Sequence, residues 1–243
     1  MFTYIRNISA KQILAKYLLF CLVITSILSW SQTTNVPDVS FEDYLEMHDA
    51  DGNEVSVGDN TSMGDGILNN ALVSTDRIDF VTSLNIVGLD IQSLVGIEDF
   101  SSLEILVVNN NRLEEIDVSS NNSLRILNVS DNRIAGELDV SSNPDLEGLF
   151  CSSNQISVLN LNNNQVLRDL SVRRNFLTTL DLSTINTTVC PDPQTEPTTP
   201  CQGGGLIDVS ENQLISLTIS NGFNELFNSF IATDNPDLFC IKI

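Results

Sequence analysis

Few side chains in this sequence are of types that could do catalytic chemistry. The chain has one histidine, His48, which is therefore its only candidate for a histidine general base. Glu114 and Glu115 could imitate the paired carboxylates of a glycoside hydrolase, although adjacent acidic residues on a repeat surface are more simply solvated. The sequence contains no glycine-rich phosphate loop, no zinc signature and no coherent Ser, His and Asp order. We therefore expect no catalysis and no cofactor.

An acidic segment carries the one pattern that could bind a metal. Asp49, Asp51 and Asn53 follow the D-x-D-x-N spacing of calcium loops. However, Gly52 stands at the fourth position of the pattern and not at the sixth, and Asn60 replaces the usual glutamate at the twelfth. An acidic turn is the preferred interpretation, and a Ca²⁺ site is kept as the alternative.

The first 32 residues are typical of a secretory signal peptide. Three basic residues precede an apolar run of twelve, YLLFCLVITSIL, which is too short to span a bilayer comfortably. An uncleaved anchor and lipidation at Cys21 are the alternatives. Export to an oxidising compartment favours a disulfide between Cys190 and Cys201, which flank a ten-residue segment. We expect a secreted or outer cell-surface protein with no membrane insertion after the signal is removed.

The charge balance narrows the class of partner. The whole chain has a formal net charge of −21, and its leading segment contains Arg6, Lys11 and Lys16 but no acidic residue. Such a surface repels nucleic acid and anionic membranes. Cationic partners, divalent ions or simple colloidal solubility fit it better.

Stepping along the chain by 21 or 22 residues reveals an internal repeat of the form LxxLxLxxNxL. Its four regular copies are Leu103, Leu106, Val108, Asn111 and Leu113; Leu124, Leu127, Val129, Asn132 and Ile134; Leu146, Leu149, Cys151, Asn154 and Ile156; and Leu167, Leu170, Val172, Asn175 and Leu177. A second, similar segment follows in each copy, as IDVSSN, LDVSSN, LNLNNN and LDLSTI. Four matches in register predict a repeat architecture.

This spacing predicts a solenoid of short parallel strands. Apolar residues two apart lie on one face of a strand, and the chain must return after about 21 residues to place the next strand alongside, about 4.8 Å away. A turning backbone inside the stack would leave main-chain groups unpaired, and an asparagine amide offers both donors and acceptors to them. We expect such a structural ladder, pairing with these groups and with the next asparagine, at Asn111, Asn132, Asn154, Asn175, Asn212 and Asn235.

These motifs resemble the leucine-rich-repeat superfamily. The double pattern is similar to the nested 21-residue class called IRREKO repeats, whose Cys position is occupied here by Cys151, which we interpret as a small buried residue. The segment LDIQSLVGIEDFSSLEIL resembles the first repeats of internalin-like bacterial surface proteins. The resemblance implies a solenoid with strands on one face, a second short strand or turn segment on the other, and a small helical N-terminal cap.

The expected domains follow from these features. Residues 33–80 form the cap and the acidic loop, in which Ser40 and Asp43 resemble a capping box and Phe41 and Leu45 face the stack. Residues 81–243 form the solenoid, interrupted by an inserted loop at about 185–203. No polar C-terminal cap follows, and NPDLFCI resembles a segment that leads into a type IX sorting domain in related secreted proteins. We therefore expect a fragment of a longer protein.

Binding by a solenoid uses the outward positions of its strands. One such column contains Val107, Asn128, Phe150 and Ser171, and Arg173 and Arg174 stand close to it in the sequence. Aromatic and arginine side chains are enriched where binding energy concentrates, so an exposed Phe150 beside two arginines predicts a contact patch for a protein or a surface glycan. The alternative is a structural or glycan-contacting repeat segment of a larger secreted protein.

Overall fold

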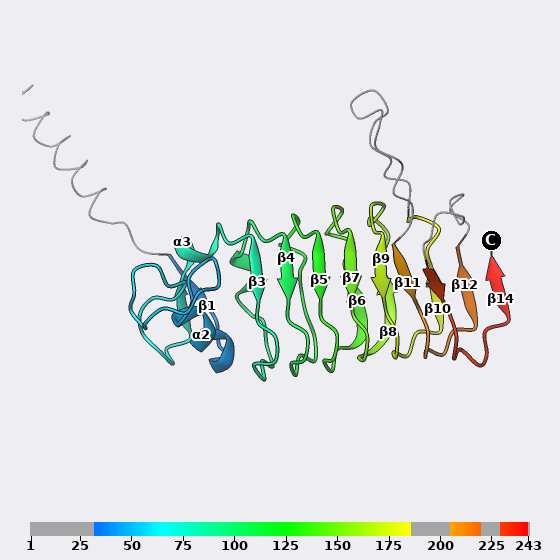
Figure 1. Cartoon of the computed structure of the whole chain (residues 1–243), viewed down its shortest axis with the longest axis horizontal. Coiled ribbons are helices and arrows are strands. Elements are labelled where there is room, and N and C mark those ends of the chain that lie inside the picture. The colour runs from blue at the N-terminus through cyan, green and yellow to red at the C-terminus, as the bar shows by residue number, and fades with distance from the viewer. Residues whose placement is uncertain (1–31, 186–204, 220–228, 243) are drawn as a thin grey trace, which may run out of the picture. The chain divides into compact units, whose positions relative to one another are not determined.

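The structure is a computed structural model that describes residues 32–185, 205–219 and 229–242 (Figure 1). The expected signal peptide and the Cys190–Cys201 pair lie outside the described residues. So does the expected inserted loop, except for Ile185, which is buried. Within the described part of the chain, no helix is long and apolar enough to cross a bilayer.

Seven short parallel strands form the main sheet, in the order β3 (Ser83–Asn85), β4 (Ile105–Val107), β5 (Ile126–Asn128), β7 (Gly148–Phe150), β9 (Asp169–Ser171), β11 (Leu206–Asp208) and β13 (Ser229–Ile231). Each strand has three residues, and its middle residue points into the stack. The register pairs Leu84, Leu106, Leu127, Leu149, Leu170, Ile207 and Phe230 in one row. Six of them, from Leu84 to Ile207, are 2% exposed or less.

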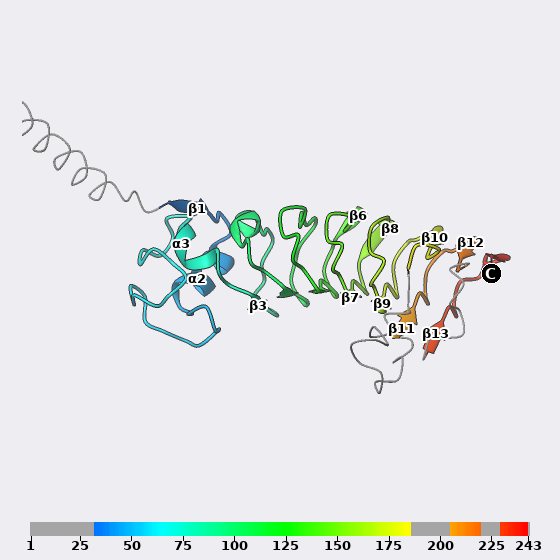
Figure 2. The same ribbon diagram turned by 90° about the horizontal axis from the view of Figure 1, so that it is seen from above.

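The return segments form smaller parallel sheets on the other side of the stack, as the turned view shows (Figure 2). One sheet pairs β6 (Ala135–Asp139) with β8 (Gln155–Asn160), and the other pairs β10 (Thr179–Asp181), β12 (Ser216–Thr218) and β14 (Cys240–Lys242). The earlier coils turn there without a strand, and one contains the 3₁₀ helix η1 (Ile97–Asp99). The predicted repeat solenoid, with parallel strands on one face and short segments on the other, is confirmed.

The strands of the main sheet stay in register although the segment between β9 and β11 is longer than the other connections. Leu170 in β9 pairs directly with Ile207 in β11, 37 positions later, whereas successive strands elsewhere are 21 to 23 residues apart. The extra residues therefore leave the sheet continuous.

The N-terminal cap contains two antiparallel strands and two short helices. β1 (Thr33–Asn35) pairs with β2 (Leu72–Ser74), and α2 (Val39–Glu46) and α3 (Thr75–Ile78) lie beside them. Phe41 and Leu45 on α2 are fully buried, and the Phe41 ring stacks on Phe100 of the first coil with centroids 6.2 Å apart. The cap thus covers the apolar end of the stack.

The helix α2 begins earlier than its sequence suggested. Asp38 is the N-cap, because its Oδ1 accepts a hydrogen bond from the Phe41 N–H at 3.1 Å, so the capping box expected at Ser40 and Asp43 is wrong. The second Asp38 oxygen accepts the N–H groups of Gln92 and Ser93 at 2.8 and 3.1 Å. One carboxylate therefore caps the helix and ties it to the first coil.

Two carboxylates on α2, which sequence analysis did not single out, are buried. Glu42 accepts the Asn70 N–H at 2.8 Å, and Glu46 accepts those of Asp65 and Gly66 at 2.6 and 2.9 Å. Burial raises the pKa of Glu46, while these two N–H groups oppose the rise. A side chain at Gly64 would overlap the Glu46 carboxyl group and would have to displace it. These contacts hold the loop against the helix.

Candidate binding surface

The six predicted ladder asparagines occupy equivalent places in successive coils. Each Nδ2 donates to a main-chain carbonyl of its own coil and to one of the preceding coil; for Asn154 these are Cys151 O at 3.2 Å and Val129 O at 2.9 Å. Each Oδ1 accepts a main-chain N–H, which for Asn154 is that of Ile134 at 2.9 Å. The same pattern holds at the other five positions. The amide partners are main-chain atoms, whereas we had also expected pairing with the next asparagine.

A second row of asparagines lines the return segments. Asn121, Asn143 and Asn164 are completely buried, and each Nδ2 donates to two main-chain carbonyls, one of them in the preceding asparagine for Asn143 and Asn164. Their Oδ1 atoms have no hydrogen-bond partner among the described residues. These asparagines therefore link the return segments of successive coils, and each side chain makes fewer hydrogen bonds than a ladder asparagine does.

The residue before each ladder asparagine has a left-handed backbone, with φ between 51° and 59°. Asn and Asp adopt this conformation at low cost, and they occupy three of the six positions. Ser153, Arg174 and Glu211 occupy the other three, where a left-handed residue costs about 1–2 kcal/mol. Arg174 and Glu211 are neighbours in the stack, and they form an ion pair.

The outward positions of the main sheet form two columns. The predicted column of Val107, Asn128, Phe150 and Ser171 is present in register, and the structure extends it with Asn85 before it and with Asp208 and Ile231 after it. In the parallel column, Ile105, Ile126 and Gly148 precede the acidic Asp169. Four half-buried apolar side chains therefore gather on β4, β5 and β7, and we call them the apolar outer patch: Ile105, Val107, Ile126 and Phe150.

Phe150 is less exposed than the sequence suggested. It is half-buried, because its ring lies across Gly148, two residues earlier in the same strand. A Cβ added at Gly148 would be 3.1 Å from Phe150 Cε2. Phe150 is consequently part of a flat apolar surface and not a projecting ring.

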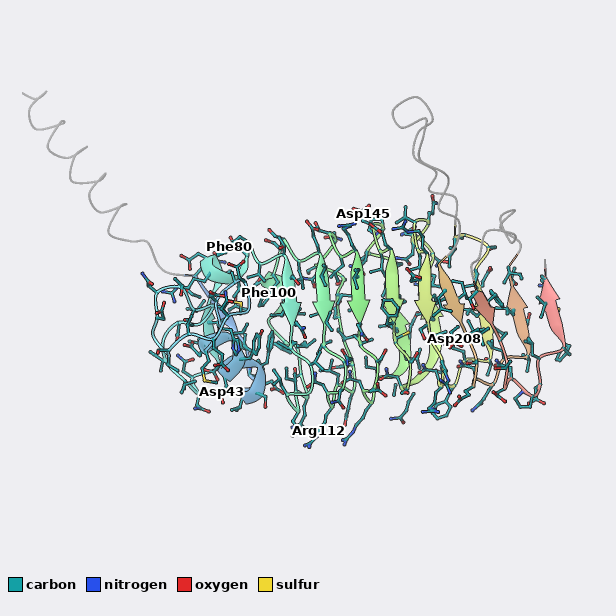
Figure 3. All side chains as sticks on the ribbon, in the orientation of Figure 1. Asp43, Phe80, Phe100, Arg112, Asp145 and Asp208 are labelled. Carbon is teal, nitrogen blue, oxygen red and sulfur yellow. The ribbon has the colours of Figure 1, made fainter. Side chains whose placement is uncertain are left out.

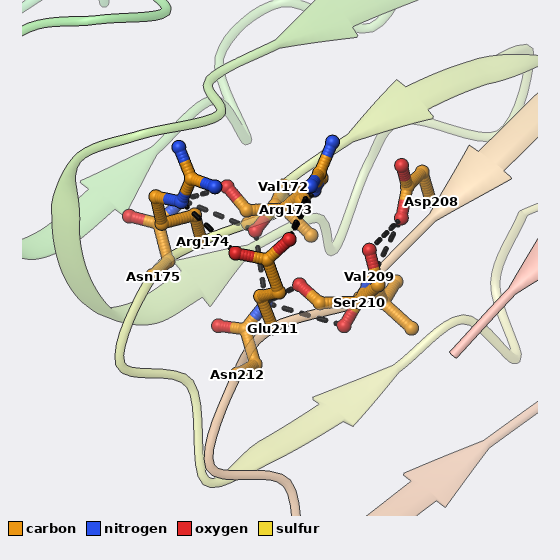
Figure 4. Close-up of polar contacts among 9 residues, drawn as sticks. All are labelled: Val172, Arg173, Arg174, Asn175, Asp208, Val209, Ser210, Glu211 and Asn212. Atoms are coloured by element: carbon orange, nitrogen blue, oxygen red, sulfur yellow. Dashed lines mark hydrogen bonds and ion pairs between the residues drawn. The ribbon is translucent and has the colours of Figure 1, made fainter. Parts of the chain in front are cut away.

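Arg173 and Arg174, the two predicted contact arginines, form ion pairs within the chain (Figure 4). Arg173 Nε and Arg174 Nε donate to the two oxygens of Glu211, at 2.7 and 2.9 Å, and Arg173 Nη2 also bonds to Glu211. Hydrogen bonds from both guanidinium groups lower the pKa of Glu211, and the same pairing raises the pKa of Arg173. The arginines therefore lie in the turn after β9, where they share one carboxylate and are not free side chains.

Sequence reasoning missed a row of alternating charges at the edge where the strands begin. Glu104, Arg125, Glu147 and Arg168 each precede a strand, and a groove of about 500 Å³ passes them near Asp145 (Figure 3). Arg125 Nη2 lies 2.7 Å from Glu147 Oε1, and Arg168 contacts the other Glu147 oxygen. These pairs lower the pKa of Glu147. Alternation at the position before each strand was visible in the repeat alignment and could have revealed the row.

The acidic loop uses its candidate metal ligand for its own structure. The Asn53 side-chain amide donates to both Asp49 oxygens at 3.2 and 3.1 Å, and Asp49 Oδ1 also accepts the N–H groups of Asn53 and Asp51 at 2.9 and 3.0 Å. These bonds lower the pKa of Asp49. Among the residues that the structure describes, no group of three or more His, Cys, Asp or Glu could hold a metal ion. His48 stacks on Tyr44 with centroids 3.9 Å apart. These side chains shape a turn.

Cys151 occupies the inner row beside the ladder. It is a free thiol with no exposed surface, and burial raises its pKa to about 12. A thiol that ionises so weakly is a poor nucleophile at neutral pH. Its environment is that of the valines found at the same position in neighbouring coils.

Comparison with known proteins finds similar solved structures but no related sequence family. No family model and no curated protein matches the chain. The leucine-rich-repeat ectodomain of the plant receptor kinase GASSHO1/SCHENGEN3 from Arabidopsis thaliana, in complex with Casparian strip integrity factor 2, is 19% identical, with a TM-score of 0.48, over 66% of this chain and 20% of the receptor chain. The functional domain of InlJ from Listeria monocytogenes is 18% identical, with a TM-score of 0.29, over 86% of this chain and 63% of its own.

The internalin inlF from Listeria monocytogenes is 17% identical, with a TM-score of 0.46, over 86% of this chain and 69% of its own. The chain spans about a fifth of the plant ectodomain that it resembles. Similarity at this level assigns no activity and no partner to the chain.

Proposed function

We propose that the chain is a non-catalytic protein-binding or adaptor module that is secreted or held on the outer cell surface. Secretion through residues 1–32 and the nested repeat class are parts of this proposal, and both rest on the sequence. The single observation that supports binding is the apolar outer patch on a rigid parallel sheet. Protein interfaces have such an apolar centre with a polar rim.

The surroundings of the patch match that description. Val107 and Phe150 lie within it, and Asn128 stands between them in the same column. Ser171 and Asp208 continue the column as polar residues. The row of alternating charges lies along the edge where the strands begin. Arg173 and Arg174, both paired with Glu211, belong to the rim and would contribute less than two free arginines.

The test compares one change on two faces. Val107→Lys places a charge in the apolar outer patch, and Val158→Lys places the same charge on β8, on the other side of the stack, where Val158 is 51% exposed. A protein captured by the wild-type chain and by Val158→Lys, but lost by Val107→Lys, supports the proposal. Equal capture by both variants, with both folded, contradicts it.

A second candidate is a structural or glycan-contacting repeat segment of a larger secreted protein. It is favoured by the position of Phe150 between Asn128 and Ser171 in the outward column, because an aromatic residue beside amide and hydroxyl groups suits a sugar ring. Binding of the chain to an array of surface glycans, lost in Phe150→Ala, would favour this candidate. Absence of glycan binding would remove its glycan-contacting form.

A further inference from the structure

The first strand of the main sheet has an edge that no described strand covers. β3 is the last strand in the sheet order, and its one partner within the described chain is β4 (Figure 1). Ile105 N donates to Thr82 O at 3.0 Å, and Ile86 N donates to Val107 O at 2.9 Å. Main-chain groups of alternate residues point to opposite edges of a strand. Ser83 and Asn85 therefore direct their N–H and C=O groups away from β4.

These main-chain groups of Ser83 and Asn85 have no hydrogen-bond partner among the described residues. Both residues are exposed. In the next four coils the N–H equivalent to that of Ser83 bonds to the main-chain carbonyl just before the preceding strand, as Ile105 N does to Thr82 O. The cap covers the apolar side chains at this end of the stack but provides no strand for its main chain.

A groove of about 470 Å³ lies against this open edge, and we call it the cap groove. It is lined by Ser83 and Asn85 of β3 and by Tyr44, Asp49 and Asp51 of the cap. None of the residues that line it is basic. Asp49 remains ionised at neutral pH, since hydrogen bonds from Asn53 lower its pKa. The groove thus combines unpaired main-chain groups with negative charge.

We propose that the cap groove binds an extended, cationic peptide segment of a partner protein, which adds to the main sheet as a strand beside β3. The donor and acceptor groups of Ser83 and Asn85 are about 6.7 Å apart along the strand, which is the repeat of alternate residues in a second strand. Addition of a peptide strand to an open sheet edge is an established mode of recognition. The acidic wall selects lysine or arginine side chains on that strand. This site is distinct from the apolar outer patch.

The test uses a capped six-residue peptide of alternating valine and lysine and the purified full chain, with affinity measured by calorimetry. We expect saturable binding and slower amide exchange at Ser83 and Asn85. Ser83→Pro removes one outward N–H without touching the bonds to β4, because proline is tolerated where the N–H faces away from the sheet. It should weaken binding by about tenfold, as expected for one lost main-chain bond, while the matched Ser83→Ala keeps the N–H and the affinity.

Two further measurements keep the test decisive if Ser83→Pro unfolds. The same peptide with alternate amides methylated should fail to bind the wild-type chain, and a valine and glutamate peptide should bind more weakly. Asp51→Asn should reduce the affinity for the lysine peptide, and Phe150→Ala should not, which separates this site from the proposed function. Absence of binding at millimolar peptide, or equal binding of the methylated peptide, overturns the proposal. A dimer of the chain that is lost in Ser83→Pro would assign the edge to self-association and overturn it also.

Discussion

At the scale of single residues, stability in this stack comes from asparagine amides that bond in more than one direction. Asn154 joins Val129 of the preceding coil, Cys151 of its own coil and Ile134 of the return segment. No shorter or apolar side chain can replace these three contacts. A change at one such residue therefore affects two coils.

We predict that Asn154→Ala lowers the free energy of unfolding by about 1–3 kcal/mol, because it leaves buried main-chain groups unpaired. The control is Asn162→Ala, which removes an exposed amide from the return segment that follows Asn154. It should change the free energy of unfolding by less than about 0.5 kcal/mol. Urea denaturation followed by circular dichroism measures both. Equal effects would show that the ladder bonds are not the source of stability.

Glu211 gives a residue-scale prediction about pH. Its folded-state pKa lies below its ordinary value of 4.5, owing to Arg173 and Arg174. A lowered pKa means that the carboxylate stabilises the fold above pH 4.5 and that this contribution disappears as the pH falls through the folded-state pKa. The wild type should therefore melt above Glu211→Gln at pH 7, and the gap should close on acidification. A gap that is independent of pH would contradict the ion-pair explanation.

At the scale of elements, the cap and the first coil depend on one another through Asp38. Its carboxylate begins α2 at the Phe41 N–H and also holds the N–H groups of Gln92 and Ser93. The sequence pattern pointed to Ser40 because local spacing alone cannot show that a residue 54 positions later shares the same carboxylate.

Asp38→Ala should therefore loosen both elements at once. We expect a loss of about 1–2 kcal/mol in unfolding free energy, the usual value of an N-cap, together with faster amide exchange at Gln92 and Ser93. Ser40→Ala is the matched control and should change neither quantity. Faster exchange in the Ser40 variant alone would restore the capping box that the sequence suggested.

At the scale of the whole molecule, acidic residues far outnumber basic ones. Asp and Glu total 32 against 11 Lys and Arg, and several of the arginines are already paired, as Arg112 is with Asp90 and Arg125 with Glu147. Repulsion among the unpaired carboxylates therefore opposes the compact state. Added salt screens both this repulsion and the exposed ion pairs. Because the ion pairs are few, we expect the loss of repulsion to have the larger effect on stability.

We predict that raising NaCl from about 0.05 to about 0.5 M raises the melting temperature by about 2–4 °C, equivalent to about 1 kcal/mol. Differential scanning calorimetry measures this shift, and a matched series in sodium acetate separates screening from ion-specific effects. A fall in melting temperature with salt would mean that the ion pairs outweigh the repulsion.

The sequence alone determined the repeat, the inward and outward positions and the six ladder asparagines, because a two-residue alternation and a 21-residue return are properties of the local chain. Only the tertiary structure decided which groups meet across coils. It paired Arg174 with Glu211, 37 residues away, and it laid the Phe150 ring over Gly148. It also left the outer edge of β3 open beside the acidic loop. Such contacts depend on stacking geometry, since a side chain selects its partner from whatever the neighbouring coil and the cap bring within reach.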